Sequence, residues 1–260
     1  MNFINTHSHV FDKDFDHDRE EVLQRAIDAG IARIILPDID AAHRPMMLKL
    51  SKSHKPLCIP LIGIHPTSVK ENYKHELTEF DKAVEEETPI GIGEIGIDLH
   101  WDTTFLKEQE EVFLHQMRYA LAHDLPVVIH VREAFNEIFD ILETLKSPQF
   151  KGIFHCFSGD YEQAQRVIDM GFYIGIGGVI TFPKSGLDKL VENLPLERIV
   201  LETDDPWLTP RTCKAQRNEP AFVVAVAQKV AEVKRLPLEE IARITTENAL
   251  RVFLNNRLID

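Results

Sequence analysis

Two histidines separated by one residue stand near the start of the sequence, at His7 and His9. They follow a short apolar run, and in a strand the side chains two residues apart point to the same side. Two imidazoles that converge at the end of a strand supply half of the ligands of a metal site. A single pair of this kind is more often an ordinary surface or core feature, so its meaning depends on the rest of the chain.

Eight short apolar runs alternate with longer stretches of helical periodicity along the 260 residues. Apolar strands separated by helices predict a parallel sheet. Eight such units predict a single (β/α)8 TIM barrel over residues 1–260, with the active site at the carboxyl-terminal rim of the strands. The alternative is an open doubly wound sheet, which would usually carry a glycine-rich loop after its first strand. The expected strands are residues 3–6, 32–36, 57–64, 90–94, 126–130, 152–155, 172–176 and 198–202.

Metal-competent side chains recur where these runs end. In a (β/α)8 barrel the carboxyl ends of all strands open onto one rim, which would bring these side chains together. With His65 left aside, four imidazoles and two carboxylates exceed what one tetrahedral ion needs, and they suit two ions that share a bridging carboxylate. The residues concerned are His7, His9, His65, Glu94, His130, His155 and Asp204.

Glu94 stands between the two halves of this set in the sequence and is the expected bridge. One ion would be held with Glu94 by residues near the two ends of the chain, His7, His9 and Asp204. The other would be held with Glu94 by residues of the middle strands, His130 and His155.

Imidazole-rich ligation favours zinc, manganese or iron, because magnesium prefers oxygen ligands. The expected cofactors are two divalent ions, with zinc, manganese and magnesium as the candidates. A third ion stays open, because His65 and Glu202 have no firm assignment.

The composition is that of a soluble cytoplasmic protein. The formal net charge of −13 argues against general binding of nucleic acid or anionic membranes by the whole surface. Three widely spaced cysteines indicate free thiols in a reducing compartment. No apolar run approaches the length of about 20 residues that spans a bilayer, and no signal peptide is recognisable. No obligate protein partner is evident.

Seven short segments, in order along the chain, resemble the TatD-type deoxyribonucleases, metal-dependent hydrolases of the amidohydrolase-like barrel group. The resemblance implies a (β/α)8 fold, divalent metal ions and hydrolysis of DNA phosphodiesters. One departure from the family pattern is Asp205, which adds negative charge close to where a phosphate is expected. The matching segments are Asn5-Thr6-His7-Ser8-His9, Gly63-Ile64-His65-Pro66, Gly93-Glu94-Ile95-Gly96-Ile97-Asp98, Ile129-His130-Val131-Arg132, Phe154-His155-Cys156-Phe157-Ser158-Gly159, Glu202-Thr203-Asp204 and Arg217-Asn218-Glu219-Pro220.

The strand ends also separate two branches of two-metal hydrolases. Many amidohydrolases bridge their ions with a modified lysine on a barrel strand, whereas here the fourth expected strand ends in Glu94 and no lysine ends any of the eight. This pattern argues against a lysine-bridged enzyme and agrees with the nuclease branch. Two other functions stay open: a small-molecule ester, lactone or amide metallohydrolase of the amidohydrolase group, and a non-catalytic metal-dependent binding module.

The expected reaction is attack of a metal-activated water on phosphorus. Asp204 would bind one ion and accept the proton of the water, while Glu94 would hold both ions. His65 would contact the scissile phosphate or the leaving oxygen. Glu202, two residues before Asp204 on the same strand, would orient a ligating imidazole, with a purely structural role as the alternative.

A chain with this net charge needs a local basic surface to bind DNA. The loop of residues 207–218 directly follows the eighth expected strand and carries Arg211, Lys214 and Arg217 without an acidic residue. Arg132, near the end of the fifth strand, is a further candidate contact for phosphate.

Aromatic residues in the same region suggest how bases would bind. Trp207 and Trp101 lie in expected rim loops, where unpaired bases could stack on them. Because the basic surface is small, the expected substrate is a single-stranded DNA end, and 3′–5′ exonuclease activity is expected over endonuclease activity.

Overall fold

Parallel strands form the centre of the molecule. The computed structural model describes residues 1–145 and 150–253, and each strand in this part of the chain pairs in parallel with its neighbours. The strands are β1 (Phe3–Asn5), β2 (Ile31–Leu36), β3 (Cys58–Pro60), β4 (Ile92–Asp98), β5 (Val127–Arg132), β6 (Gly152–Phe154), β7 (Tyr173–Ile176) and β8 (Ile199–Leu201).

The strands follow one another in sequence order, as β1–β3 and β4–β8, and hydrogen bonds connect these two sheets at both edges. At the first edge the N–H of Gly93 donates to the carbonyl oxygen of Ile62 (2.9 Å), and Ile62 forms an isolated parallel bridge with Ile92. At the second edge the N–H of Thr6 donates to the carbonyl oxygen of Leu201 (3.0 Å). The predicted (β/α)8 barrel is confirmed.

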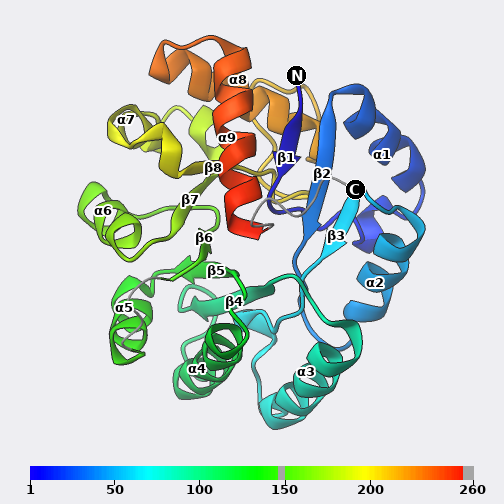
Figure 1. Cartoon of the computed structure of the whole chain (residues 1–260), viewed down its shortest axis with the longest axis vertical. Coiled ribbons are helices and arrows are strands. Elements are labelled where there is room, and N and C mark those ends of the chain that lie inside the picture. The colour runs from blue at the N-terminus through cyan, green and yellow to red at the C-terminus, as the bar shows by residue number, and fades with distance from the viewer. Residues whose placement is uncertain (146–149, 254–260) are drawn as a thin grey trace.

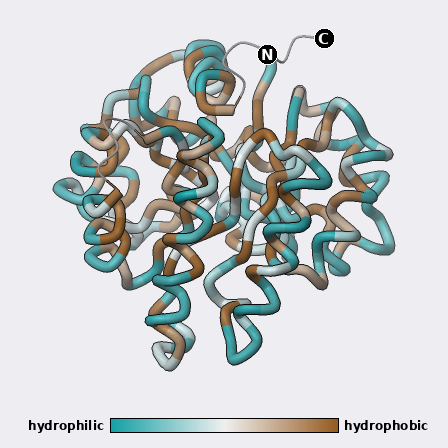
Figure 2. The backbone as a smooth tube through the Cα atoms, turned by 60° about the horizontal axis from the view of Figure 1, so that its bottom comes forward, coloured by the Kyte–Doolittle hydropathy of each residue, from teal (hydrophilic) through white to brown (hydrophobic). Residues whose placement is uncertain are grey.

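Helices surround the strands (Figure 1). Hydrophobic and hydrophilic stretches alternate along them (Figure 2), as expected for helices that bury one face against a sheet. Within residues 1–145 and 150–253, no helix is both long and apolar enough to cross a membrane. The α-helices are α1 (Arg19–Asp28), α2 (Arg44–Ser53), α3 (Tyr73–Glu87), α4 (Leu106–Ala122), α5 (Phe135–Thr144), α6 (Tyr161–Asp169), α7 (Leu187–Asn193), α8 (Val223–Lys234) and α9 (Leu238–Phe253). Short 3₁₀ helices span Lys13–Phe15, Pro66–Ser68, Gly178–Thr181, Leu196–Arg198 and Pro220–Phe222.

The last helix, α9, lies across one end of the barrel (Figure 1). Its side chains join an apolar cluster with residues from six strands or strand ends, so this end of the barrel is filled. Burial of one large apolar side chain stabilises the fold by about 1.5–3 kcal/mol. The cluster comprises Ile4, Ile35, Leu61, Val128, Ile153, Val200, Ala249, Val252 and Phe253.

The barrel interior changes from apolar to polar along the strands. Val128 and Ile153 belong to the apolar cluster beneath α9. His130 and His155 come two residues later, so they point to the same side but nearer the carboxyl ends. These two predicted ligands are therefore placed toward the end of the barrel opposite α9.

The fourth strand is longer than predicted. It was expected to end at Glu94, but β4 continues to Asp98, so Glu94 lies inside the strand. Gly96 allows this continuation, because its φ of 149° and its close approach to the carbonyl oxygen of His130 leave no room for a side chain. A glycine followed by a charged residue is typical of the end of a strand, so the sequence pattern predicts a strand shorter than β4.

Candidate metal centre

Backbone hydrogen bonds between the loops after β1 and β8 bring the two ends of the chain together. The N–H of Asp204 donates to the carbonyl oxygen of His7 (3.0 Å), and the N–H of His9 donates to that of Asp205 (3.0 Å). Asp204 adopts a left-handed backbone conformation with a φ of 56°, which Asp tolerates better than most residues. Its carboxylate is thereby placed beside the two histidines.

One oxygen of the Glu94 carboxylate faces this pair of histidines. Oε2 lies 3.1 Å from Nε2 of His7 and 3.5 Å from Nε2 of His9. Oδ1 of Asp204 lies 3.6 Å and 3.7 Å from the same two nitrogens. The four predicted ligands of the first ion therefore form one cluster.

The other oxygen of Glu94 faces a second group of imidazoles. Oε1 lies 2.7 Å from Nε2 of His155, 2.8 Å from Nδ1 of His130 and 3.2 Å from Nε2 of His65. His65, which had no assigned ion, is therefore part of the same cluster as His130. The two carboxylate oxygens of Glu94 therefore face different nitrogen atoms, although the two groups meet where the rings of His7 and His155 stack at 3.8 Å.

The electrostatics of the cluster suit a divalent cation. Glu94 is only 2% exposed, and burial opposes its ionisation, but the imidazoles around it hold its pKa well below the usual range. Burial, together with the nearby His155, lowers the pKa of His7 well below its usual value and keeps that imidazole neutral. The Nε2 atoms of His7 and His9 face each other at 3.0 Å, and Nε2 is an atom through which a neutral imidazole binds a metal ion.

Three overlapping sets of three residues could each hold an ion. Within a set, every residue offers one ligand atom, and these atoms lie within 4.8 Å of one another. Their nitrogen and oxygen donors are those of zinc, manganese and related divalent ions. The sets are His7 with His9 and Glu94, His7 with His155 and Asp204, and His65 with Glu94 and His130.

Two further carboxylates lie behind imidazoles of the cluster, and one of them is hydrogen-bonded to its imidazole. Oδ2 of Asp98 lies 2.8 Å from Nε2 of His130, so Nδ1 of that ring is the atom that faces Glu94. Oε1 of the fully buried Glu202 lies 3.8 Å from Nδ1 of His155, too far for a hydrogen bond, and accepts one from the N–H of Cys156. A carboxylate hydrogen-bonded to a metal ligand, as Asp98 is to His130, fixes the tautomer and orientation of that ligand.

Comparison with known proteins identifies the family. The sequence model described as TatD related DNase matches residues 4–254. The chain belongs to the TatD family.

Relatives of this TatD-family protein cover almost its whole length. The uncharacterized metal-dependent hydrolase YabD of Bacillus subtilis is 36% identical and covers 97% of this chain and 99% of its own. The 3′-5′ ssDNA/RNA exonuclease TatD of Pantoea ananatis is 31% identical and covers 92% and 94%. The crystal structure of the TatD homologue YjjV of Escherichia coli superposes with a TM-score of 0.90 at 32% identity, covering 96% and 97%. The TatD-family chain is accordingly a metal-dependent hydrolase.

Sequence reasoning gave no role to two residues that support the TatD-family centre. Asp98 lies four residues after Glu94, on the same side of β4, and this spacing is visible only if the strand is extended past Glu94. The fully buried Asn218 was noted only as part of a motif. Its side-chain amide donates to the carbonyl oxygens of Thr203 (2.8 Å) and Trp207 (2.6 Å), on either side of Asp204.

Replacing Asn218 with alanine is expected to weaken both the fold and the metal site. Two buried carbonyl groups would lose their donor, which costs about 1–3 kcal/mol for each unsatisfied group. The turn that positions Asp204 would then be less rigid. Thermal melting and bound metal per chain measure the two effects, and Asn218→Asp should behave similarly because a carboxylate cannot donate. Unchanged melting and metal content in both variants would show that these hydrogen bonds are unimportant.

Asp205 was expected to add negative charge near the phosphate site, but its carboxyl group points into the protein. Its side chain is fully buried and accepts hydrogen bonds from the hydroxyl groups of Ser8 (2.9 Å) and Thr203. Burial raises the pKa of Asp205 to about 7. Because its carboxyl group points into the protein, Asp205 ties the β1 and β8 loops together instead of facing solvent.

The aromatic rings predicted to bind substrate lie on the rim. The ring of Trp207 is half exposed, and its centroid lies 5.4 Å from that of His9. Trp101 is exposed, and the guanidinium of Arg132 lies over its ring at 5.1 Å. Trp207 is thus directly beside the metal cluster.

The two arginines of the β8–α8 loop lie apart from the cluster. Arg211 is exposed, and its guanidinium lies 5.0 Å from the ring of Phe182. Arg217 donates to Oδ2 of Asp18 (2.6 Å) and to the carbonyl oxygen of Asp14 (2.6 Å), where the loop meets the start of α1. The structure does not bring Arg217 to the metal ligands, because its guanidinium holds the loop in place.

Adding Zn²⁺ or Mn²⁺ to chelator-treated protein is expected to raise the melting temperature and release protons. Burial alone would lower the pKa of His155, but Glu94 outweighs it and raises that pKa to about 10, so the metal-free imidazole is charged at neutral pH. A ligating imidazole must be neutral, so metal affinity should fall as the pH falls. Calorimetry in two buffers with different ionisation enthalpies measures the released protons. Equal heats in both buffers and an unchanged melting temperature would contradict this expectation.

Proposed function

We propose that this TatD-family hydrolase cleaves phosphodiester bonds of DNA as a 3′–5′ exonuclease on single-stranded ends, with two divalent ions at its centre. The observation that carries the proposal is the division of the Glu94 carboxylate between two groups of imidazoles, at 3.1 Å from His7 and 2.7 Å from His155. A bridging carboxylate of this kind is the arrangement that a pair of ions needs.

Each ion would have its own set of ligands. The first would be held by His7, His9 and Asp204 and the second by His130 and His155, with Glu94 common to both. His155 also lies close enough to His7 and Asp204 to share an ion with them. His65 is close enough to join the second ion or to contact a phosphate oxygen. Zinc and manganese fit these nitrogen donors best, and magnesium is the third candidate. When bound, such ions lower the pKa of a water molecule and neutralise charge on phosphate oxygens.

The protein side chains would orient the reactants and move one proton. The Asp204 side chain is 15% exposed, against 2% for Glu94, so it is the carboxylate that a water molecule can reach. Burial raises the pKa of Asp204, which makes it a better proton acceptor than an ordinary carboxylate. Asp98 would keep the His130 ring in its orientation through their hydrogen bond, and Glu202 would place a second negative charge 3.8 Å from His155.

The surroundings of the centre favour a single strand over a duplex. Trp207 and Trp101 offer exposed rings on which unpaired bases could stack, at about 1–3 kcal/mol for each base. The rim cations Arg132 and Arg211 could contact the backbone phosphates of a short segment. The net charge of −13 disfavours long electrostatic tracking along a duplex. The relative from Pantoea ananatis carries a name that includes both single-stranded DNA and RNA, so RNA belongs in the test.

A labelled-strand assay tests the proposal. Purified protein with added Mn²⁺ should convert a 5′-labelled single-stranded oligonucleotide into a ladder of progressively shorter labelled products, and it should act more slowly on a blunt duplex. A 3′ label should be lost as the first product. Parallel reactions on a panel of esters, lactones and cyclic amides provide the comparison. If the protein hydrolyses compounds of that panel but shortens no oligonucleotide, the proposed nuclease activity is wrong and a small-molecule hydrolase is favoured.

A further inference from the structure

A groove of about 680 Å³ lies between the β6–α6 loop and the β7–α7 segment. Its volume falls within the range of about 300–1,000 Å³ typical of ligand sites. Both walls follow the carboxyl ends of strands, so the groove opens on the same rim as the metal cluster. The lining residues used below are Phe157, Tyr161, Val179, Leu187 and Leu190.

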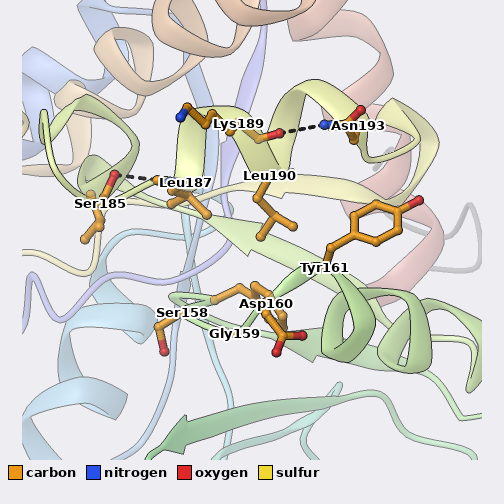
Figure 3. A pocket seen from close by; sticks show the side chains of 12 residues that line it. Ser158, Gly159, Asp160, Tyr161, Ser185, Leu187, Lys189, Leu190 and Asn193 are labelled. Atoms are coloured by element: carbon orange, nitrogen blue, oxygen red, sulfur yellow. Dashed lines mark hydrogen bonds between the residues drawn. The ribbon is translucent and has the colours of Figure 1, made fainter.

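The groove has an apolar floor and an aromatic edge. Phe157 and Leu187 are buried, and Figure 3 shows Leu190 pointing from α7 toward the start of α6, which carries Tyr161. Tyr161, the first residue of α6, is 51% exposed. With Trp101 and Trp207 it is one of three aromatic residues in the described chain that are both large and exposed, and all three lie on the rim.

Two charged residues line the groove, Asp160 and Lys189, and their formal charges are opposite. The carboxylate of Asp160 accepts a hydrogen bond from the N–H of Gln163 (2.8 Å) and caps the first turn of α6. Hydroxyl and amide groups of Ser158, Ser185 and Asn193 lie around the edge (Figure 3). A flat ring with polar edges fits this combination better than a charged group does.

Two of the segments that line the groove adjoin segments of the metal cluster. Phe157 follows the candidate ligand His155 by two residues, and the left-handed conformation of Cys156 (φ 43°) turns the chain between them. On the other side, a Cβ on Gly178 would lie 2.2 Å from the carbonyl oxygen of Leu208, so the segment before Val179 packs directly against the loop that carries Trp207.

We propose that this groove binds a nucleobase of the same single strand whose phosphate lies at the metal centre, with the base stacked on Tyr161 over the apolar floor. The inference rests on the proposed nuclease function and adds a second contact point for the substrate. A strand held at Trp207 and again at Tyr161 would follow the rim past the ligands, which positions the phosphate between the two contacts.

The test is a series of single-stranded oligonucleotides in which one base at a time is replaced by an abasic residue. In the wild-type protein, loss of the base that occupies the groove should raise KM by about tenfold, since stacking on an aromatic ring has an effect of this size. Tyr161→Ala should raise KM by a similar factor for the intact strand, and the abasic residue should then have little further effect. Tyr161→Phe keeps the ring and should match the wild type, and kcat should stay unchanged in both variants.

The possible failures are distinguishable. Because Tyr161 is half exposed, Tyr161→Ala should melt at the wild-type temperature, and Ile27→Ala, which removes an exposed apolar side chain on α1, is the matched control with unchanged KM. If the wild type shortens oligonucleotides but every abasic position has the same effect with and without Tyr161, the groove assignment alone is overturned. If the wild type shortens no oligonucleotide, the nuclease function fails and the groove assignment falls with it.

Discussion

Replacing Glu94 with glutamine is expected to remove bound metal and hydrolytic activity together. Each oxygen of the carboxylate faces its own group of imidazoles, and an amide would turn one of these acceptors into a donor. Loss of a residue that merely supports a metal ligand costs about 10–100-fold in affinity or activity, and loss of the shared carboxylate should cost more than that. Metal content by mass spectrometry and kcat on a single-stranded oligonucleotide measure the two effects.

Glu76→Gln is the matched control for this variant. Glu76 is a buried glutamate on α3 that accepts a hydrogen bond from the N–H of Ala41, away from the metal ligands. It should retain wild-type metal content and activity. Full metal content in Glu94→Gln would show that the carboxylate does not bridge ions.

Replacing Asp204 with asparagine is expected to lower kcat by about 10²-fold or more, because the amide cannot accept the proton of the attacking water. The side chain keeps its shape and its position beside His7 and His9, so KM for the oligonucleotide should change little. Single-turnover kinetics on a labelled strand measure the chemical step. A rate near that of the wild type would remove Asp204 from the role of base.

Asparagine at the neighbouring Asp205 is expected to affect stability more than the rate of the reaction. Its carboxyl group is buried against Ser8 and Thr203, so Asp205→Asn should lower the melting temperature more than it lowers kcat. If both variants lost the same activity and the same stability, the two carboxylates would not have separate roles.

The fold and the ligand cluster could be predicted because both depend on repeated patterns. Apolar runs at regular spacing predict parallel strands, and the barrel brings all their carboxyl ends to one rim. His7 near the start and Asp204 near the end therefore meet although almost the whole chain separates them. The prediction required only the positions of residues relative to strand ends.

The supporting residues depend on details that periodicity does not contain. Asp98 reaches His130 because β4 runs four residues past Glu94 and Gly96 lets β5 approach closely. Arg217 was expected on phosphate because it lies in a basic loop, but the fold places acidic residues of another segment beside it. Loop-to-loop packing of this kind also forms the groove at Tyr161, and it appears only in three dimensions.

The most direct test of the two-metal centre bridged by Glu94 is a crystal structure of the protein with Mn²⁺, in which anomalous scattering locates the ions. We expect two separate peaks on either side of Glu94, one beside His7 and His9 and the other beside His130 and His155. A single peak, or two peaks that do not share Glu94, would contradict the bridged two-metal centre on which the proposed function depends.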